Sequence, residues 1–501
     1  MKKNLLIATT LLHAFGMQQV VAQGVNNLWL GGYASWAGTP YGGVDIEFQN
    51  GSREVDYGNR VIDYYRANAN ITGANGNLLL SSNGCFLGNS ISDTLLNGSG
   101  LSPGFYTDLY PDGIFANQAV LLLPRPVQQF SEATNTYFLF HGTIDDGPNS
   151  AAGYLYLTTI DMAGDGGLGE AVSKNEIMIT DALNVGKITA VRHANGRDWW
   201  VFCHKLNSNI YYRILVTPEG ASVDGTQAIG IVRPADVGQV CFSPDGTKFA
   251  YYWGVDDLEI FDFDRCTGLF SDPVFIPIDD TNTNGGVAFS PNSRFLYASS
   301  VVDMYQYDTD AADIEASMVH LGTWDEFFSP FEPFATAFDL AQLAPDGKIY
   351  LSTGNSTFHL HVIHDPDQPG LACNFEQHGV ELVRWFWNSL PNHPNYHLGP
   401  IDGSVCDSLG INVGVAEQRA QGELQVFPNP TTGNFQASYP AHSTVGVLTV
   451  LDAHGKVVYE HRIPQWSTVH AVQLAEQPAG MYHCRLQWGN EKLTTRIIMQ
   501  E

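Results

Sequence analysis

The chain has 501 residues, of which 44% are hydrophobic, so it is long enough to bury more than one core. Its 52 acidic residues outnumber its 24 basic ones, which gives a formal net charge of −28. Nucleic acids and anionic lipids are bound through clusters of Lys and Arg, so this balance argues against both as partners.

The first 22 residues have the layout of a secretory signal peptide. Two lysines precede an apolar run over 5–15, and small residues follow at Val20 and Ala22. We expect cleavage before Gln23. No later stretch has the ~18 consecutive apolar residues that a membrane-spanning helix needs, so the sequence predicts an exported protein without such a span.

A strand–turn–strand unit recurs through the middle of the chain. Its clearest copy is residues 238–253 (GQVCFSPDGTKFAYYW), with similar copies at 285–300 and 338–353 and a looser one at 187–204. In each copy a short polar turn separates two apolar runs, and its residue types are those that tight turns favour. The equivalent turn residues are 50, 47 and 54 positions apart: Asn195, Asp245, Asn292 and Asp346.

A β-unit repeated about every 50 residues predicts a β-propeller. A single blade cannot cover both of its faces, but stacking blades around an axis covers them and protects the strand edges. Over residues 23–410 the period gives roughly seven or eight blades, and we predict about seven. A two-sheet sandwich is the alternative. Residues 78–87 indicate a further copy with its turn at 82–84, and 137–141 and 154–161 indicate two strands of one blade.

Two loops carry motifs that occur in ligand sites. Residues 164–169 contain G-x-G-x-x-G, but without the βαβ context of a dinucleotide site, so we predict an inter-strand loop. The acidic segments 161–170 and 308–315 are typical of solvated turns. As an alternative, their carboxylates could hold calcium weakly, although 161–170 lacks two oxygen ligands of a regular calcium loop.

A histidine-rich segment gives a weak candidate metal site. His359 and His361 are two residues apart, so on a strand they share a face, and His364 and Asp365 follow closely. Together they could bind zinc or a similar ion. The alternative is a strand with outward-facing polar histidines. There is no H-E-x-x-H motif, G-x-S-x-G elbow or Walker loop, so we assign no catalytic residue.

The seven cysteines are too sparse for a disulfide scaffold, and at least one is unpaired. Cys373 and Cys406 flank a segment rich in Pro, Asn and His, and we predict a disulfide between them. Two free core thiols are the alternative.

The residue composition and the pattern of apolar runs change after about residue 410. Residues 411–422 are small and polar, as in a linker. Residues 423–501 then contain seven short apolar runs separated by turns, which predicts a small β-sandwich.

This last region resembles the type A C-terminal sorting domain of the type IX secretion system of Bacteroidetes. The likeness runs through 426–433 (VFPNPTTG), 452–457 (DAHGKV), 478–482 (PAGMY) and 492–498. The motif residues are Pro428, Asn429, Pro430, Gly433, Gly455, Gly480 and Tyr482. An ordinary adhesive module is the alternative.

The resemblance implies export across the inner membrane by the signal peptide and across the outer membrane by the type IX machinery, followed by surface attachment or release. The propeller region resembles secreted proteins of the same bacteria with WD40-like repeats, through 76–84, 195–200 and 389–396. This second resemblance implies a fold but no activity.

We therefore expect an exported or surface-displayed propeller that binds a protein, peptide or glycan and needs no cofactor other than calcium, if any. Trp199, Trp200, Trp385 and Trp387 could stack on sugars or peptides, although packing between blades is the alternative. Two other functions stay open. One is a hydrolase or lyase acting on polysaccharide or peptide, with a site assembled from several blades; the other is a structural or adhesive matrix component.

Overall fold

The computed structural model describes residues 25–49, 52–73, 76–128, 134–145, 151–255, 257–278, 284–401, 403–407, 424–440, 442, 444–474, 477–489 and 491–500. The predicted signal peptide and the predicted linker 411–422 lie outside the described residues. No helix in the described ranges is both long and apolar enough to cross a membrane.

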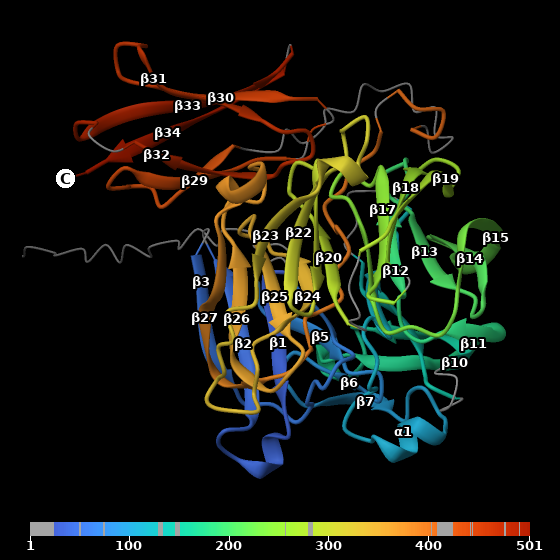
Figure 1. Ribbon diagram of the computed structural model, residues 1–501. Coiled ribbons are helices and arrows are strands. Elements are labelled where there is room, and N and C mark those ends of the chain that lie inside the picture. Colours follow the sequence, from blue (N-terminus) through green and yellow to red (C-terminus); the bar gives the residue numbers. More distant parts are fainter. Residues whose placement is uncertain are drawn as a thin grey trace, which may run out of the picture.

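Seven antiparallel sheets follow one another along the first 386 residues, each built from consecutive strands (Figure 1). The first blade has three strands: β1 (Leu28–Tyr33), β2 (Gly42–Gln49) and β3 (Ser52–Gly58). The second has β4 (Ala69–Thr72), β5 (Leu78–Ser82), β6 (Phe86–Gly88) and β7 (Thr94–Ser99); the third has β8 (Val120–Pro124), β9 (Thr136–Gly142), β10 (Ala151–Asp161) and β11 (Glu170–Asn184). The second and third blades also touch through one parallel pair, Leu96 with Glu170.

The remaining four blades each have four strands. They are β12 (Thr189–Arg192), β13 (Trp199–His204), β14 (Ser208–Thr217) and β15 (Gly220–Arg233); β16 (Gln239–Phe242), β17 (Lys248–Trp253), β18 (Asp257–Asp264) and β19 (Leu269–Ile276); β20 (Gly286–Phe289), β21 (Phe295–Ser300), β22 (Asp303–Asp308) and β23 (Val319–Thr323); and β24 (Phe338–Leu343), β25 (Ile349–Thr353), β26 (Thr357–Ile363) and β27 (Phe375–Phe386). Helices are short: α1 (Phe105–Leu109), η1 (Ser35–Ala37), η2 (Asp165–Gly167), η3 (Glu315–Ser317) and η4 (Gly370–Cys373).

The repeated turn occupies equivalent places in four blades. It joins the first and second strands of each, and its Asn or Asp side chain accepts a hydrogen bond from the backbone N–H two residues later; for Asp245 the donor is Thr247 N, at 2.9 Å. The residue between them has positive φ, 72° at Gly246 and 64° at Ser293. Each turn is stabilised by a hydrogen bond from the backbone to the turn's own Asn or Asp side chain, so its conformation depends on a few adjacent residues. This is why the repeat could be predicted from the sequence.

One predicted copy has a different place in its blade. Residues 78–87 form β5 and β6, the second and third strands of the second blade, and not the first and second. The true first turn lies one strand earlier, where Gly73 N donates to the oxygen of Asn77 at 2.9 Å. The prediction of two strands of one blade at 137–141 and 154–161 is confirmed by β9 and β10.

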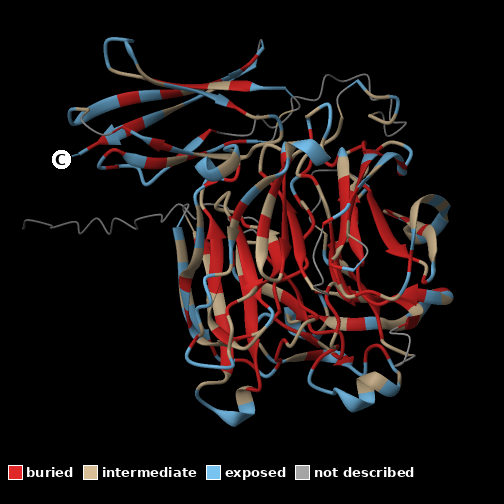
Figure 2. Cartoon of the chain, in the orientation of Figure 1, coloured by how far each residue is buried: buried red, intermediate tan, exposed pale blue. Residues whose placement is uncertain are grey.

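The ring closes by burying apolar side chains between neighbouring blades. The last and first blades share one buried cluster, in which Leu340 and Tyr350 pack with Trp29 and Val44. Corresponding clusters fill the spaces between the other blades. Figure 2 shows this buried material along the propeller strands. Because every blade shares its core with both neighbours, the all-β propeller prediction is confirmed, with seven blades.

The C-terminal region forms two further sheets with a core of their own, at the top of Figure 1. One sheet has the order β28–β29–β32 and the other β31–β30–β33–β34. The strands are β28 (Gln425–Phe427), β29 (Asn434–Ser438), β30 (Gly446–Leu451), β31 (Val457–Ile463), β32 (Val469–Gln473), β33 (Gly480–Trp488) and β34 (Glu491–Met499). This confirms the predicted small β-sandwich.

Candidate functional site

The axis of the propeller is filled by the chain itself. After β27 ends, residues 388–398 run through the centre of the ring, and we call them the channel segment. Asn392 shows how the segment is held: its Nδ2 donates to the oxygens of Val120 and Ile188, both at 2.8 Å, and its Oδ1 accepts from Gln118 at 3.3 Å. These partners come from the third and fourth blades and the connection before the third. The channel segment therefore occupies the axis, and the two ends of the axis are the places where a ligand could meet the loops of several blades.

Other bonds of the channel segment reach further blades. His393 Nε2 lies 2.7 Å from the oxygen of Asn70, Tyr396 donates to Leu122 O at 2.8 Å, and Asn395 donates to Pro244 O at 2.7 Å. Asn388 donates to the carboxylate of Asp339 at 2.9 Å. Four separate side chains thus anchor the segment to the second, third, fifth and last blades.

One end of the axis is covered by the C-terminal sandwich. A cavity of about 1550 Å³ lies there, lined by the repeated turns, by the channel segment at Asn392 and His393, and by sandwich residues that include Trp466 and His470. Trp466 packs against the buried cluster between the fourth and fifth blades, and Arg265 lies 5.8 Å from its ring centroid. Access to this end is therefore restricted while the sandwich is in place.

The opposite end carries a continuous set of aromatic side chains. Neighbouring ring centroids lie 4.9 to 6.4 Å apart, which is the range of favourable edge and offset contacts. We call this set the aromatic belt: Tyr33, Tyr41, Tyr65, Phe105, Tyr106, Tyr110, Phe115, Phe331, Phe334, Trp385 and Trp387.

The belt is assembled from loops of distant blades. Tyr33 and Tyr41 flank the loop between β1 and β2, Phe115 follows α1, and Phe334 belongs to the connection between β23 and β24. Trp387 follows β27 immediately before the channel segment. Figure 1 shows α1 on the side of the propeller away from the C-terminal sandwich. Loops held by a rigid scaffold in this way are common places for binding sites.

Polar groups lie among the rings. Arg66 stacks on Phe115, with Cζ 4.5 Å from the ring centroid, and its buried Nε has no hydrogen-bond partner among the described residues. Burial lowers the pKa of Arg66, against the opposing effect of Asp339. Burial also raises the pKa of Tyr33 to about 12, so its hydroxyl stays protonated and donates to Ser356. The belt thus combines flat apolar faces with fixed donors, as ligand sites do.

Two buried carboxyl groups near the belt have raised pKa values. Burial raises the pKa of Asp339 to about 6, although Arg66 and Asn388 favour its charged form. Burial likewise raises the pKa of Asp63, whose carboxylate accepts bonds from the backbone and side chain of Ser35. Asp339 is 1% exposed and Asp63 is 8% exposed. We call the end of the axis that carries the aromatic belt the mouth. Both carboxyl groups therefore hold the loops of the mouth in place and do not face a ligand directly.

The four predicted tryptophans divide into two pairs. Trp199 and Trp200 are buried, and Trp199 stacks under Arg192 at 3.8 Å, so these two pack between blades. Trp385 and Trp387 are half-buried members of the aromatic belt. Sequence reasoning singled out this second pair but missed the belt as a whole. The available signal was the aromatic density of its loops, such as 327–334 (FFSPFEPF) and 385–387 (WFW).

The candidate metal ligands do not converge. His359 Nδ1 bonds Ser329 Oγ at 2.7 Å, whereas buried His361 accepts from the backbone of His378 at 2.9 Å. His364 instead lies 2.7 Å from the carboxylate of Glu376, and Asp365 is exposed in the following turn. Within the described ranges no three His, Cys, Asp or Glu side chains are grouped so that they could hold a metal ion.

The acidic loops are satisfied locally. Asp161 accepts from the backbone of Ala163 at 2.9 Å, and Asp308 is paired with Arg294 at 2.7 and 3.0 Å. Residues 164–169 form the turn around η2 between β10 and β11, in agreement with the loop that we predicted there.

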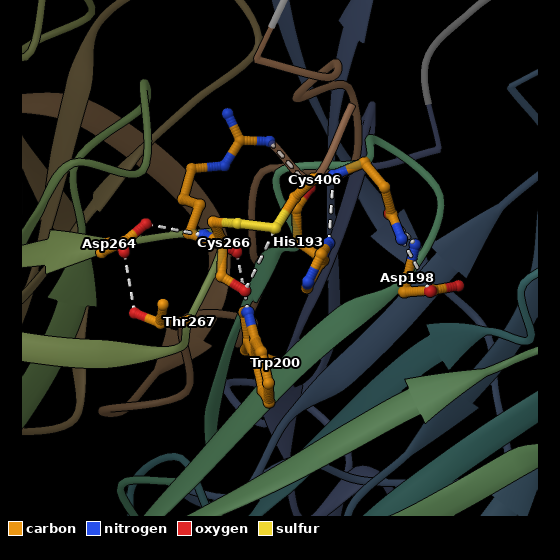
Figure 3. Close-up of a disulfide and its surroundings, with 9 residues drawn as sticks. His193, Asp198, Trp200, Asp264, Cys266, Thr267 and Cys406 are labelled. Carbon is orange, nitrogen blue, oxygen red and sulfur yellow. Dashed lines mark hydrogen bonds between the residues drawn. A yellow bond between two sulfur atoms is a disulfide. The ribbon is translucent and has the colours of Figure 1, made fainter. Parts of the chain in front are cut away.

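The predicted disulfide partner is wrong. Cys406 bonds Cys266, in the turn between β18 and β19 (Figure 3). Cys373 is a free, buried thiol. The turn is shaped by Asp264, which accepts from Cys266 N, and by Trp200, which donates to the oxygen of Arg265 at 2.9 Å. The channel segment crosses the ring before it reaches Cys406, so proximity in sequence to Cys373 does not bring the two thiols together.

The sorting-motif residues lie at turns and strand ends of the C-terminal sandwich. Asn429 Nδ2 donates to Arg496 O at 2.7 Å and its Oδ1 accepts from Ile498 N at 2.8 Å, which ties the 428–430 turn to β34. Gly433 and Gly455 have φ of 112° and 80°, where a side chain would be strained. The others are Pro428, Pro430, Gly480 at the start of β33, and Tyr482, which donates to Pro478 O at 2.8 Å.

A family model described as a secretion system C-terminal sorting domain matches residues 425–500. No curated protein matches the chain. Among solved structures, a protein of Lactobacillus plantarum is 12% identical with a TM-score of 0.43, covering 73% of this chain and 99% of its own. A putative 6-phosphogluconolactonase from Bacteroides fragilis is 12% identical with a TM-score of 0.40, over 74% and 98%.

PorZ, a surface component of the type IX secretion system of Porphyromonas gingivalis, is 10% identical with a TM-score of 0.29, over 92% of this chain and 68% of PorZ. Because all three scores are below 0.5, the fold assignment depends on the seven sheets described above. The family match and the motif geometry together lead to one conclusion: residues 425–500 are a type IX secretion system C-terminal sorting domain, carried by an exported β-propeller protein.

Proposed function

We propose that this protein is a secreted or surface-displayed propeller that binds a protein, peptide or glycan ligand at the aromatic belt. The observation that carries the proposal is the belt itself: a continuous set of rings at the end of the axis that the sorting domain leaves uncovered. Several of its rings are exposed, including Phe105 at 69% and Phe331 at 63%. Contiguous exposed apolar surface on an exported protein is typical of an interaction site.

Binding suits this mouth better than catalysis does. A hydrolase or lyase needs carboxylates or histidines that reach the substrate. Asp339 and Asp63 have raised pKa values, but both are buried and hydrogen-bonded to the protein's own groups. Asp145, beside Gly104, also has a pKa raised by burial, and it is half-buried and accepts a bond from Gly153 N at 2.6 Å. Propeller hydrolase or lyase activity is therefore the second candidate, and it would depend on the exposed carboxylates of the mouth loops, Asp108, Asp112 and Glu332.

The route to the cell surface is part of the proposal. Residues 1–22 act as the export signal, 23–410 form the propeller, 411–422 the linker and 423–501 the sorting domain. The signal-peptide layout of the N-terminus and the sorting-domain match support this division. The source is then a bacterium of the Bacteroidetes, and the repeats are of the WD40-like kind.

The test is capture of ligands by the chain from residue 23 to 501, on arrays of glycans and peptides, with and without calcium. Wild-type protein is compared with the double variant Trp36→Ala/Tyr110→Ala. Tyr110 belongs to the belt, and Trp36 is an exposed ring in the loop between β1 and β2, beside the belt. The control is Phe275→Ala, which removes an exposed ring on β19 in the fifth blade. The proposal predicts that wild type and Phe275→Ala bind at least one glycan or peptide on the array that the double variant does not bind. Spots that all three proteins retain equally would place binding elsewhere.

A further inference from the structure

The exposed rings at the mouth lie on its rim, while half-buried rings lie behind them. Trp36, in the same loop as Tyr33 and Tyr41, is 80% exposed, and Tyr110 is 43% exposed. Trp385 and Trp387 lie deeper, with Trp387 donating to Gly354 O at 3.3 Å. The mouth therefore presents a graded aromatic surface, whose inner rings are fixed by packing and whose outer rings have open faces.

The mouth is a platform and not a deep pocket. The axis behind it is filled by the channel segment, anchored through Asn388 to Asp339. The cavity of about 1550 Å³ lies instead at the other end of the axis, under the sorting domain. Peptide and protein partners are usually anchored by a few side chains inserted into pockets. A ligand on this surface instead lies across successive rings.

The charged side chains around the mouth restrict the chemical class of the ligand further. Asp108, Asp112 and Glu332 are exposed on its loops, and the chain as a whole carries −28. The cations near the mouth are stacked on rings: Arg66 on Phe115, and Arg384 on Tyr57 at 4.6 Å. Three exposed carboxylates thus stand against two arginines whose faces are covered by rings, so an anionic polymer would meet net repulsion at the mouth. The carboxylates can accept hydrogen bonds from hydroxyl groups.

We propose that the ligand of the aromatic belt is a neutral polysaccharide, whose sugar rings stack on the exposed faces of the belt and of Trp36 while its hydroxyls bond the carboxylates of the rim. This inference rests on the proposed binding function and adds the chemical class of the ligand. A pyranose ring has a flat face of C–H groups and an edge of hydroxyls. Aromatic faces beside acceptors match both parts.

The test uses the chain from residue 23 to 501 and isothermal titration with four neutral probes: cellohexaose, xylohexaose, mannohexaose and laminarihexaose. Polygalacturonate and a lysine-rich peptide are the charged comparisons. We expect at least one neutral probe to bind, and Trp36→Ala and Tyr110→Ala each to weaken it about tenfold. Phe275→Ala should leave the affinity unchanged. Thermal unfolding of each variant confirms that it is folded.

Each other outcome overturns a defined part of the argument. Absence of binding by all four neutral probes rejects the polysaccharide inference. Binding of the peptide or of polygalacturonate, lost in Trp36→Ala and Tyr110→Ala, also rejects it but leaves the mouth as the binding site. If these two substitutions alter the affinity for no probe that binds, the proposed function fails as well.

Discussion

Asn392 in the channel segment offers the sharpest test of how the propeller is closed. Asn392→Ala removes two donated hydrogen bonds, to Val120 and Ile188, and one accepted from Gln118. Each such bond contributes about 1 kcal/mol net, and a buried carbonyl left unpaired costs about 1–3 kcal/mol. With Asn392 only 7% exposed, we expect the free energy of unfolding to fall by about 3 kcal/mol.

Asn395 is the matched control because its half-buried side chain makes fewer bonds: it donates one to the oxygen of Pro244 at 2.7 Å and accepts one from the exposed His397 N at 3.0 Å. Asn395→Ala should cost about 1 kcal/mol, because the exposed His397 N–H can bond water instead. Urea denaturation followed by tryptophan fluorescence measures both variants. Equal losses, or a loss below about 0.5 kcal/mol for Asn392→Ala, would show that the channel segment does not hold the blades together.

Three further predictions concern other parts of the molecule. Replacing Cys266 and Cys406 together by Ser should lower the free energy of unfolding by about 2–5 kcal/mol, because the disulfide closes a long loop. Peptide mapping of the wild type without reduction should yield the peptide pair that contains Cys266 and Cys406. A disulfide-linked pair that contains Cys373 and Cys406 would contradict this prediction. Asp339 has a folded pKa of about 6 against 3.8 ordinarily, so its stabilising effect is complete below pH 4 and is lost as the pH rises through 6. Asp339→Asn should therefore gain stability relative to wild type from pH 4 to 7, by about 3 kcal/mol, and denaturant curves that shift in parallel at every pH would refute this. Deleting 425–501 should abolish appearance of the protein outside the outer membrane, as cell fractionation would show; normal secretion of the truncated chain would remove the sorting role.

The sequence alone determined the parts of the fold that depend on short-range interactions. The Asp245 turn needs its own carboxylate, the N–H of Thr247 and a residue with positive φ, all within a few positions. Four such turns, 47 to 54 residues apart, were enough to predict about seven blades. The sorting domain could be recognised by resemblance for the same reason, because the glycine and proline turns of its motifs are local and follow one another in a fixed order.

The tertiary structure alone decided what depends on closing the ring. The channel segment carries Cys406 across the axis to Cys266, 140 residues away, and past the nearer Cys373. The aromatic belt joins Tyr33 to Trp387, rings at opposite ends of the propeller sequence that lie 5.9 Å apart. His359 and His361 are two residues apart on β26, yet each bonds a different partner, Ser329 for His359 and the backbone of His378 for His361. Contacts of this kind depend on how the blades are arranged around the axis, which no local pattern of residues encodes.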